Sequence, residues 1–269
     1  MFQLQKTSNY GSSTPAVART VLQGRPIVEF FNATAEQKSA AMELLMELQR
    51  HLLKCVETRD SLEAEIEAGR AEFVARPQSR DPTGPVMSLP GVGDLQSKAE
   101  QFLQSSKLAI ATAGNLVEPF FGAGFGHKFH KLADWATEKF GSNDDFAKRV
   151  EAAKPFVARV VKMRNAVDHP KSEPGAPLIV ANFTLQETNG ALSLVEPGWS
   201  LTGEPMQPLL VSFNLIIESI ICLCEAMLIE LFYKLRSSDI LVIEEIPIER
   251  RDPANPMALR VTIAIAPTS

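Results

Sequence analysis

The sequence predicts a mainly α-helical protein, a helical bundle with small β additions that make it α+β overall. Apolar residues recur at helical spacing over four long segments. The dipeptide Asn189-Gly190, inside "PLIVANFTLQETNGALSLVEP", is a strong signal for a β-hairpin. Two β-rich runs, "ILVIEE" and "RVTIAIA", follow the last helical segment. A chain of 269 residues that is 45% hydrophobic can bury a sizeable core without disulfides.

The N-terminal part combines an irregular start with one long helix. We expect the first twenty residues to be irregular and Ile27–Phe31 to be a short strand that could join the later strands in one small sheet. Thr34 and Gln37 have the spacing of a capping box. A long helix is therefore predicted from about residue 35 to about residue 73.

Beyond this helix, a proline- and glycine-rich linker separates it from a second helical region. The predicted organisation is an N-terminal segment with its helix (1–76), a linker (77–91), a helical core (92–236) with a hairpin insertion (about 177–197), and a C-terminal β-hairpin packed on the core (237–269). In the core, the first helix is predicted to begin at Asp94. Three further helices are predicted to span His127–Phe140, Asp144–Asp168 and about Pro208–Arg236.

Composition restricts the class of protein. The three cysteines are odd in number and show no metal-ligand spacing, which favours a reducing, cytoplasmic location without structural disulfides. The most apolar segment, Leu209–Phe232, carries three glutamates and is too polar for a simple membrane span. A face with His127, His130, Asp134 and Glu138 is more typical of a solvated helix than of a metal site. We expect no cofactor, no metal and no membrane partner.

The candidate catalytic residues lie in "KMRNAVDHPK", residues 162–171. Val157, Val160, Val161 and Arg164 are spaced to share one helical face, so Arg164 takes a place where an apolar residue is expected. Pro170 should end the helix at His169 and leave the imidazole near the carbonyl-rich helix end.

An arginine and a histidine at this spacing suit phosphate chemistry. A guanidinium can hold a phosphate through two parallel hydrogen bonds, and an imidazole can move a proton near neutral pH. These are the two needs of a metal-independent attack by an RNA 2′-hydroxyl on its own phosphate. The surrounding segment is basic, although the whole chain has a net charge of −5, and it contains Lys148, Arg149, Lys154, Arg159, Lys162, Arg164 and Lys171. Arg159, Lys162 and Lys171 are the candidate substrate-binding residues.

"RNAVDH", Arg164 to His169, resembles the R-x4-6-H motif of the HEPN superfamily, with a polar residue after the arginine. The motif also lies near the end of the third helix of a helical core, over roughly residues 92–236. The resemblance implies a homodimer that unites two Arg/His pairs, and metal-independent endoribonuclease activity in a toxin or defence effector. Arg164 would bind the phosphate, His169 would act in proton transfer, and Asn165 would support the site.

Two alternatives stay open. Glu218 and Glu225, with Asp168, could support Arg164, or the two glutamates could face solvent or a partner along an amphipathic helix. The same bundle could also be a non-catalytic module that binds a protein or a nucleic acid, with Arg164 in a structural ion pair. The expected partners are RNA, a second copy of the chain, and a cognate antitoxin or another protein.

Overall fold

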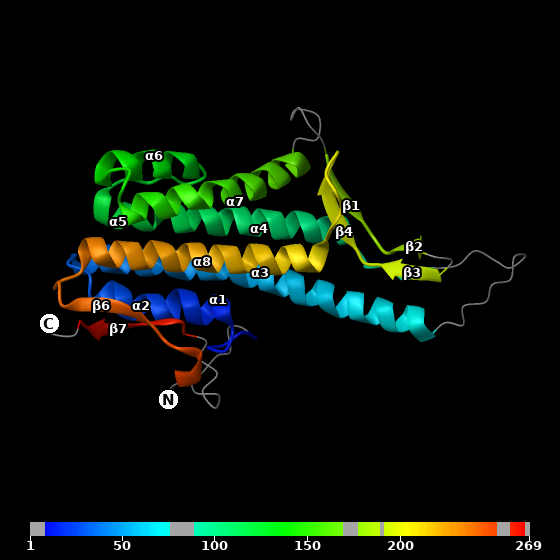
Figure 1. Cartoon of the computed structure of the whole chain (residues 1–269), viewed down its shortest axis with the longest axis horizontal. Coiled ribbons are helices and arrows are strands. Elements are labelled where there is room, and N and C mark those ends of the chain that lie inside the picture. The colour runs from blue at the N-terminus through cyan, green and yellow to red at the C-terminus, as the bar shows by residue number, and fades with distance from the viewer. Residues whose placement is uncertain (1–8, 76–88, 169–176, 189–190, 252–258, 267–269) are drawn as a thin grey trace, which may run out of the picture. The chain divides into compact units, whose positions relative to one another are not determined.

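The structure is a computed structural model that describes residues 9–75, 89–168, 177–188, 191–251 and 259–266. It is mainly helical, as the sequence predicts. The helices are α1 (Pro15–Val17), the π-helix η1 (Ala18–Leu22), α2 (Gln23–Glu29), α3 (Ala35–Ala75), α4 (Leu95–Gly114), the 3-10 helix η2 (Asn115–Val117), α5 (Glu118–Phe121), α6 (Phe129–Phe140), α7 (Asp145–Asp168), α8 (Leu209–Leu235) and the 3-10 helix η3 (Ile248–Arg250) (Figure 1).

Seven short strands form small antiparallel sheets in the described part of the chain. The strands are β1 (Leu178–Ala181), β2 (Thr184–Thr188), β3 (Ala191–Val195), β4 (Gly198–Leu201), β5 (Gln207–Pro208), β6 (Leu241–Glu245) and β7 (Val261–Ile265). β1, β4 and β5 make a three-stranded sheet in the order β1-β4-β5, whereas β2 pairs with β3 and β6 with β7. The prediction that the strands form one small sheet is therefore wrong.

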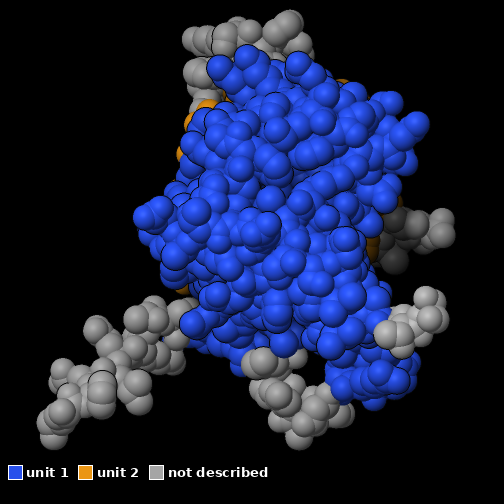
Figure 2. All heavy atoms as spheres, turned by 90° about the vertical axis from the view of Figure 1, so that its left-hand side faces the viewer, with its two compact units in different colours: residues 1–53, 106–158, 217–269 blue, residues 54–105, 159–216 orange. Residues whose placement is uncertain are grey.

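The chain divides into two compact units, each assembled from several segments (Figure 2). Unit 1 comprises residues 1–53, 106–158 and 217–269, and unit 2 comprises residues 54–105 and 159–216. The sheets divide in the same way, because β6–β7 belongs to unit 1 and the other strands to unit 2.

The core of unit 1 is built around apolar side chains of α3 and α8, such as Leu45, Leu48 and Leu228, which are buried. Gly24 of α2 sits directly against this core. A Cβ atom at Gly24 would lie 2.8 Å from a methyl group of Leu45 and 3.2 Å from one of Leu228. A side chain at this position would therefore require the buried Leu45 and Leu228 side chains, or α2 itself, to shift.

The core of unit 2 is aromatic. Phe102 of α4 stacks on Phe213 of α8, with ring centroids 3.6 Å apart and an interplanar angle of 3°. Trp199 of β4 meets both rings at steep angles. All four residues of β4 are buried, so this strand forms part of the core.

The long helix begins where the sequence predicts. The Gln37 N–H donates to Thr34 Oγ1 at 3.2 Å, and the Thr34 N–H donates to Gln37 Oε1 at 3.0 Å. This reciprocal pair is the predicted capping box. The other predicted core helices correspond to α4, α6, α7 and α8, with ends that agree within a few residues.

Two local predictions about the N-terminal part are wrong. The segment from Pro15 to Leu22 is helical, with Ala16 and residues 18–20 buried, and Ile27–Phe31 falls mostly within α2. Ile27 and Val28 are both buried in this helix, and Phe31 makes only an isolated bridge with Arg236. A short apolar run has the same composition in a buried helix as in a strand, so its pattern alone does not separate the two.

The C-terminal hairpin and the insertion agree better with prediction. β6–β7 is the expected C-terminal pair, and β2–β3 is the hairpin that the sequence signals. Its turn residues 189–190 lie outside the described residues. β4 was not predicted; it pairs with β1 and carries Trp199 into the core.

Candidate functional site

Arg164 and Asn165 lie in the last turns of α7, in unit 2, and both are half-buried. The buried stripe of this part of α7 runs through Val160, Met163 and Ala166. The predicted stripe ran through Arg164 instead, which the structure corrects. Arg164 flanks the buried face, so its guanidinium does not occupy an apolar position of the core.

A neutral side chain orients Arg164. Its Nε donates a hydrogen bond of 2.9 Å to Gln104 Oε1, from the neighbouring helix α4. The acceptor is a neutral amide oxygen, and this hydrogen bond helps to orient the guanidinium. A guanidinium can bind a planar anion through two parallel hydrogen bonds.

The second half of the motif is not described. α7 ends at Asp168, and the Asp168 side chain and residues 169–176 lie outside the described residues. The roles of His169, Asp168 and Lys171 therefore stay predictions.

Two of the candidate substrate-binding cations share one carboxylate. Arg159 Nη1 donates to Glu204 Oε1 at 2.7 Å, and Lys162 Nζ lies 3.7 Å from the same oxygen. Glu204 follows β4 in a turn that contains Gly203 with a φ of +84°, a conformation that favours glycine. The hydrogen bond from Arg159 holds the pKa of the Glu204 carboxyl below its ordinary value.

Three further described cations of the predicted basic segment also contact carboxylates, whereas Lys171 lies outside the described residues. Lys148 lies 3.6 Å from Asp145, and Lys154 lies 3.0 Å from Glu151. Arg149 Nε donates to Glu230, which is buried, at 2.5 Å. The positive charges of these residues, like those of Arg159 and Lys162, are thus largely balanced by carboxylates.

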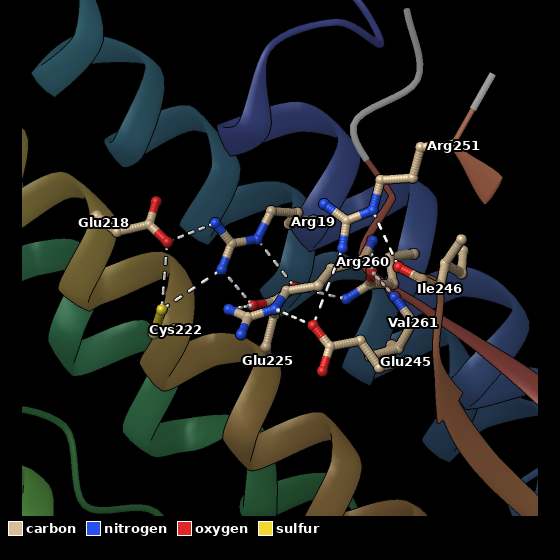
Figure 3. Close-up of polar contacts among 10 residues, drawn as sticks. Arg19, Glu218, Cys222, Glu225, Glu245, Ile246, Arg251, Arg260 and Val261 are labelled. Carbon is tan, nitrogen blue, oxygen red and sulfur yellow. Dashed lines mark hydrogen bonds and ion pairs between the residues drawn. The ribbon is translucent and has the colours of Figure 1, made fainter. Parts of the chain in front are cut away.

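Glu218 and Glu225 have a partner that the sequence did not reveal. Arg19 Nη1 donates to Glu218 Oε1 at 2.6 Å, and Arg19 Nε donates to Glu225 Oε1 at 2.9 Å (Figure 3). A second hydrogen bond from Arg19 reaches the other oxygen of Glu225. Burial alone would lower the pKa of Arg19, but its bonds to the two glutamates raise it above the ordinary value. The only sequence signal for this role was an arginine inside the apolar run "AVARTVL".

The same buried glutamate connects both ends of the described chain. Gln23 Nε2 donates to Glu225 Oε1 at 2.9 Å, while Gln23 Oε1 accepts the backbone N–H groups of Arg260 and Val261 at 2.7 and 2.9 Å. Arg260 Nη1 lies 3.8 Å from Glu225 Oε2. The N-terminal helices, α8 and the β6–β7 hairpin therefore meet in one polar cluster of unit 1, visible in Figure 3.

The described parts of the chain were compared with the requirements of a metal site and of a membrane-spanning helix. No group of three or more histidines, cysteines or acids there could hold a metal ion. None of the helices in these parts has both the length and the apolarity that a membrane span requires.

Comparisons with known proteins were made at three levels. No protein-family model matches this chain, and no curated protein or solved structure is significantly similar to it.

Proposed function

We propose that this chain is a metal-independent endoribonuclease of HEPN type, with Arg164 as its phosphate-binding residue. The observation that carries the proposal is the position of Arg164 in the last turns of α7, where its Nε donates a hydrogen bond to Gln104. In this proposal the chain acts as a cytoplasmic homodimer, which brings two such sites together, in a toxin or defence effector.

The proposed reaction needs no group beyond the chain and the RNA. The 2′-oxygen forms a bond to the adjacent phosphorus, and the bond from phosphorus to the 5′-oxygen of the next nucleotide breaks. His169 takes part in moving the 2′-hydroxyl proton and in supplying a proton to the leaving oxygen. Arg164 stabilises the charge that develops on the phosphate oxygens, and Asn165 supports it. The products are a 2′,3′-cyclic phosphate and a 5′-hydroxyl.

A second candidate function is a non-catalytic module that binds a protein or a nucleic acid, such as a cognate antitoxin. The pairing of Arg159 and Lys162 with Glu204 favours it. Cations already held by a carboxylate contribute little to RNA binding unless the carboxylate leaves, because RNA affinity depends on neutralised phosphates.

The experiment is cleavage of mixed single-stranded and structured RNA in excess EDTA. It compares wild type with Arg164→Ala, His169→Ala and the control Arg50→Ala, which removes an exposed arginine of α3. We expect wild type and Arg50→Ala to cleave equally, and the other two variants to lose at least about 100-fold in rate.

The alternative outcomes decide between the two candidates. Cleavage that disappears with EDTA, or that persists in Arg164→Ala, would overturn the ribonuclease proposal. No cleavage by any folded variant would favour the non-catalytic module, and the next step would be to search for its partner.

A further inference from the structure

Unit 1 contains a cavity of about 450 Å³ that the proposed ribonuclease chemistry does not use. Its walls come from three distant segments: Arg149 of α7, the middle of α8, and the β6–β7 hairpin with Arg260. The aliphatic part of the lining consists of Ala226 and Ile229 from α8 and of Ile243 and Val261 from the hairpin. The size and the mixed lining are those of a small-molecule site.

Arg149, one of the two arginines in this cavity, retains hydrogen-bonding capacity. It engages Glu230 through Nε, and within the described residues its two Nη groups donate no other hydrogen bond. Its side chain is 59% exposed. An anion in the cavity could therefore bind to the outer edge of this guanidinium.

Arg260 is held loosely. Its Nε lies 3.5 Å from Glu245 Oε1 and its Nη1 lies 3.8 Å from Glu225 Oε2, both longer than an ordinary charge-assisted hydrogen bond. The Glu245 side chain is 65% exposed, so it can return to water at little cost. An entering anion could take its place on Arg260.

The buried carboxylate in the wall does not repel such an anion strongly. Both oxygens of Glu225 accept hydrogen bonds from Arg19, and Oε1 also accepts one from Gln23. Arg149 and Arg260 supply the positive charge of the lining, and the exposed Glu245 is the carboxylate that an entering anion would displace.

A second hollow, of about 370 Å³, shares part of its lining with the first. The two share Arg149, Cys222 and Ala226 in their linings. The second hollow is otherwise mainly apolar, with Ala152, Ala153, Phe156 and Leu223 along α7 and α8. A ligand that starts at the arginines can thus extend a hydrocarbon chain over these side chains.

We infer that unit 1 binds an alkyl carboxylate, with its head between Arg149 and Arg260 and its chain in the apolar hollow. Two guanidinium groups match a carboxylate, which accepts several charge-assisted hydrogen bonds. Among the described residues, the lining of the head cavity contains no aromatic or amide side chain that would recognise a nucleobase. This inference is independent of the ribonuclease proposal.

The test is calorimetric titration of the full-length protein with sodium octanoate at pH 7.5. Sodium acetate, which has the same carboxylate but no long hydrocarbon chain, is the control ligand. We expect saturable octanoate binding and at least about 10-fold weaker acetate binding, because acetate cannot bury a chain. Arg260→Gln should weaken octanoate binding at least about 10-fold. Arg250→Gln, an exposed arginine of η3, is the matched control and should bind as wild type does.

Because Arg260 directly precedes β7, Arg260→Gln could also alter the β6–β7 hairpin. A second variant therefore tests the cavity alone. Ala226 is half-exposed and lines both hollows, and Ala226→Phe places a ring where they join. We expect this variant to melt as wild type does and to lose octanoate binding. Glu245→Gln removes the competing carboxylate and should strengthen binding.

Two outcomes would overturn the inference. One is the absence of saturable octanoate binding by wild type. The other is unchanged binding in an Ala226→Phe protein that circular dichroism shows to be folded. Neither outcome affects the cleavage assay, so the two proposals fail separately.

Discussion

Arg19 and Glu225 form a buried bidentate ion pair although 206 positions separate them in the chain. Arg19 is 8% exposed and Glu225 is 5% exposed. Arg19 comes from the π-helix η1, a rare geometry that occurs often at functional positions. The pair fixes the N-terminal helices of unit 1 on α8.

Loss of one member of this pair should be costly. Arg19→Met leaves the Glu225 carboxylate buried without its main partner, and we expect the free energy of unfolding to fall by about 3–5 kcal/mol. Urea denaturation followed by circular dichroism measures it. Arg70→Met is the matched control, because Arg70 is 41% exposed and pairs with Glu67 and Glu196. It should cost at most about 1 kcal/mol.

The double variant Arg19→Met/Glu225→Met separates charge from packing. Removal of both charges should recover most of the loss, since no buried carboxylate is left unpaired. A double variant no more stable than Arg19→Met would show that the contribution of Arg19 comes from packing and not from the ion pair.

The three cysteines should differ in reactivity. Cys55 and Cys224 are buried, and burial raises the pKa of Cys224 strongly. Cys222 is half-exposed; burial raises its pKa too, while the hydrogen bond from Arg19 acts against this shift. Iodoacetamide should therefore label Cys222 alone in the native protein, slowly, and faster as pH rises above neutral.

Mass spectrometry of peptides from native and urea-treated protein gives the positions of labelling. Equal labelling of Cys222 and Cys224 in the native protein would contradict the described packing of α8. Octanoate should also slow the labelling of Cys222, which lines both hollows.

The Glu204 ion pair should make stability depend on acid pH. The pKa of Glu204 is below the ordinary value of 4.5 in the folded protein, so the folded state favours the carboxylate. Its stabilising contribution is complete above the unfolded pKa and is lost as pH falls through the lower, folded pKa. Glu204→Gln should thus lower the Tm at pH 7 and flatten the fall of the Tm below about pH 4.5.

Thermal melts at closely spaced pH values, with wild type and Glu204→Gln in parallel, check this expectation. The same variant removes the carboxylate that Arg159 and Lys162 contact. Under the ribonuclease proposal it should therefore also bind RNA more tightly. If the Tm of Glu204→Gln ran parallel to that of wild type down to pH 3, the Glu204 ion pair would not be a cause of the fall in stability at acid pH.

The capping box of α3 gives a prediction of smaller size. Thr34→Ala removes the acceptor for the Gln37 N–H and should cost about 1 kcal/mol of unfolding free energy. Thr34→Ser keeps a hydroxyl at the same place and should cost only a few tenths. Urea denaturation of both variants measures the difference, and equal losses would show that the methyl group of Thr34 matters more than its hydroxyl.

The sequence predicts those features of the fold that depend on neighbouring residues. The start of α3 is encoded by Thr34 and Gln37, three positions apart, and the β2–β3 hairpin by its turn signal. The small buried strand β4 is missed, because its burial depends on Phe102 and Phe213 from other segments.

The candidate site is predictable to a smaller extent for the same reason. Arg164 is visible in the sequence as a charged residue near an apolar stripe, but its partner Gln104 is 60 positions away. The carboxylate of Glu204, which pairs with Arg159 and Lys162, lies in a turn beyond the hairpin insertion. A basic run in a sequence shows the sign of its charges and leaves out the distant acids that balance them.

The Arg19–Glu225 pair also constrains the order of events during synthesis. At about 5–20 residues per second, a ribosome adds Glu225 roughly 10–40 s after Arg19. For nearly all of that interval neither Glu218 nor Glu225 has been synthesised, so Arg19 lacks its native partners and the helices at the start of unit 1 cannot be buried with it. Gln23 must wait longer, because the backbone groups it binds belong to Arg260 and Val261. Unit 1 can therefore close only after nearly the whole chain has left the ribosome.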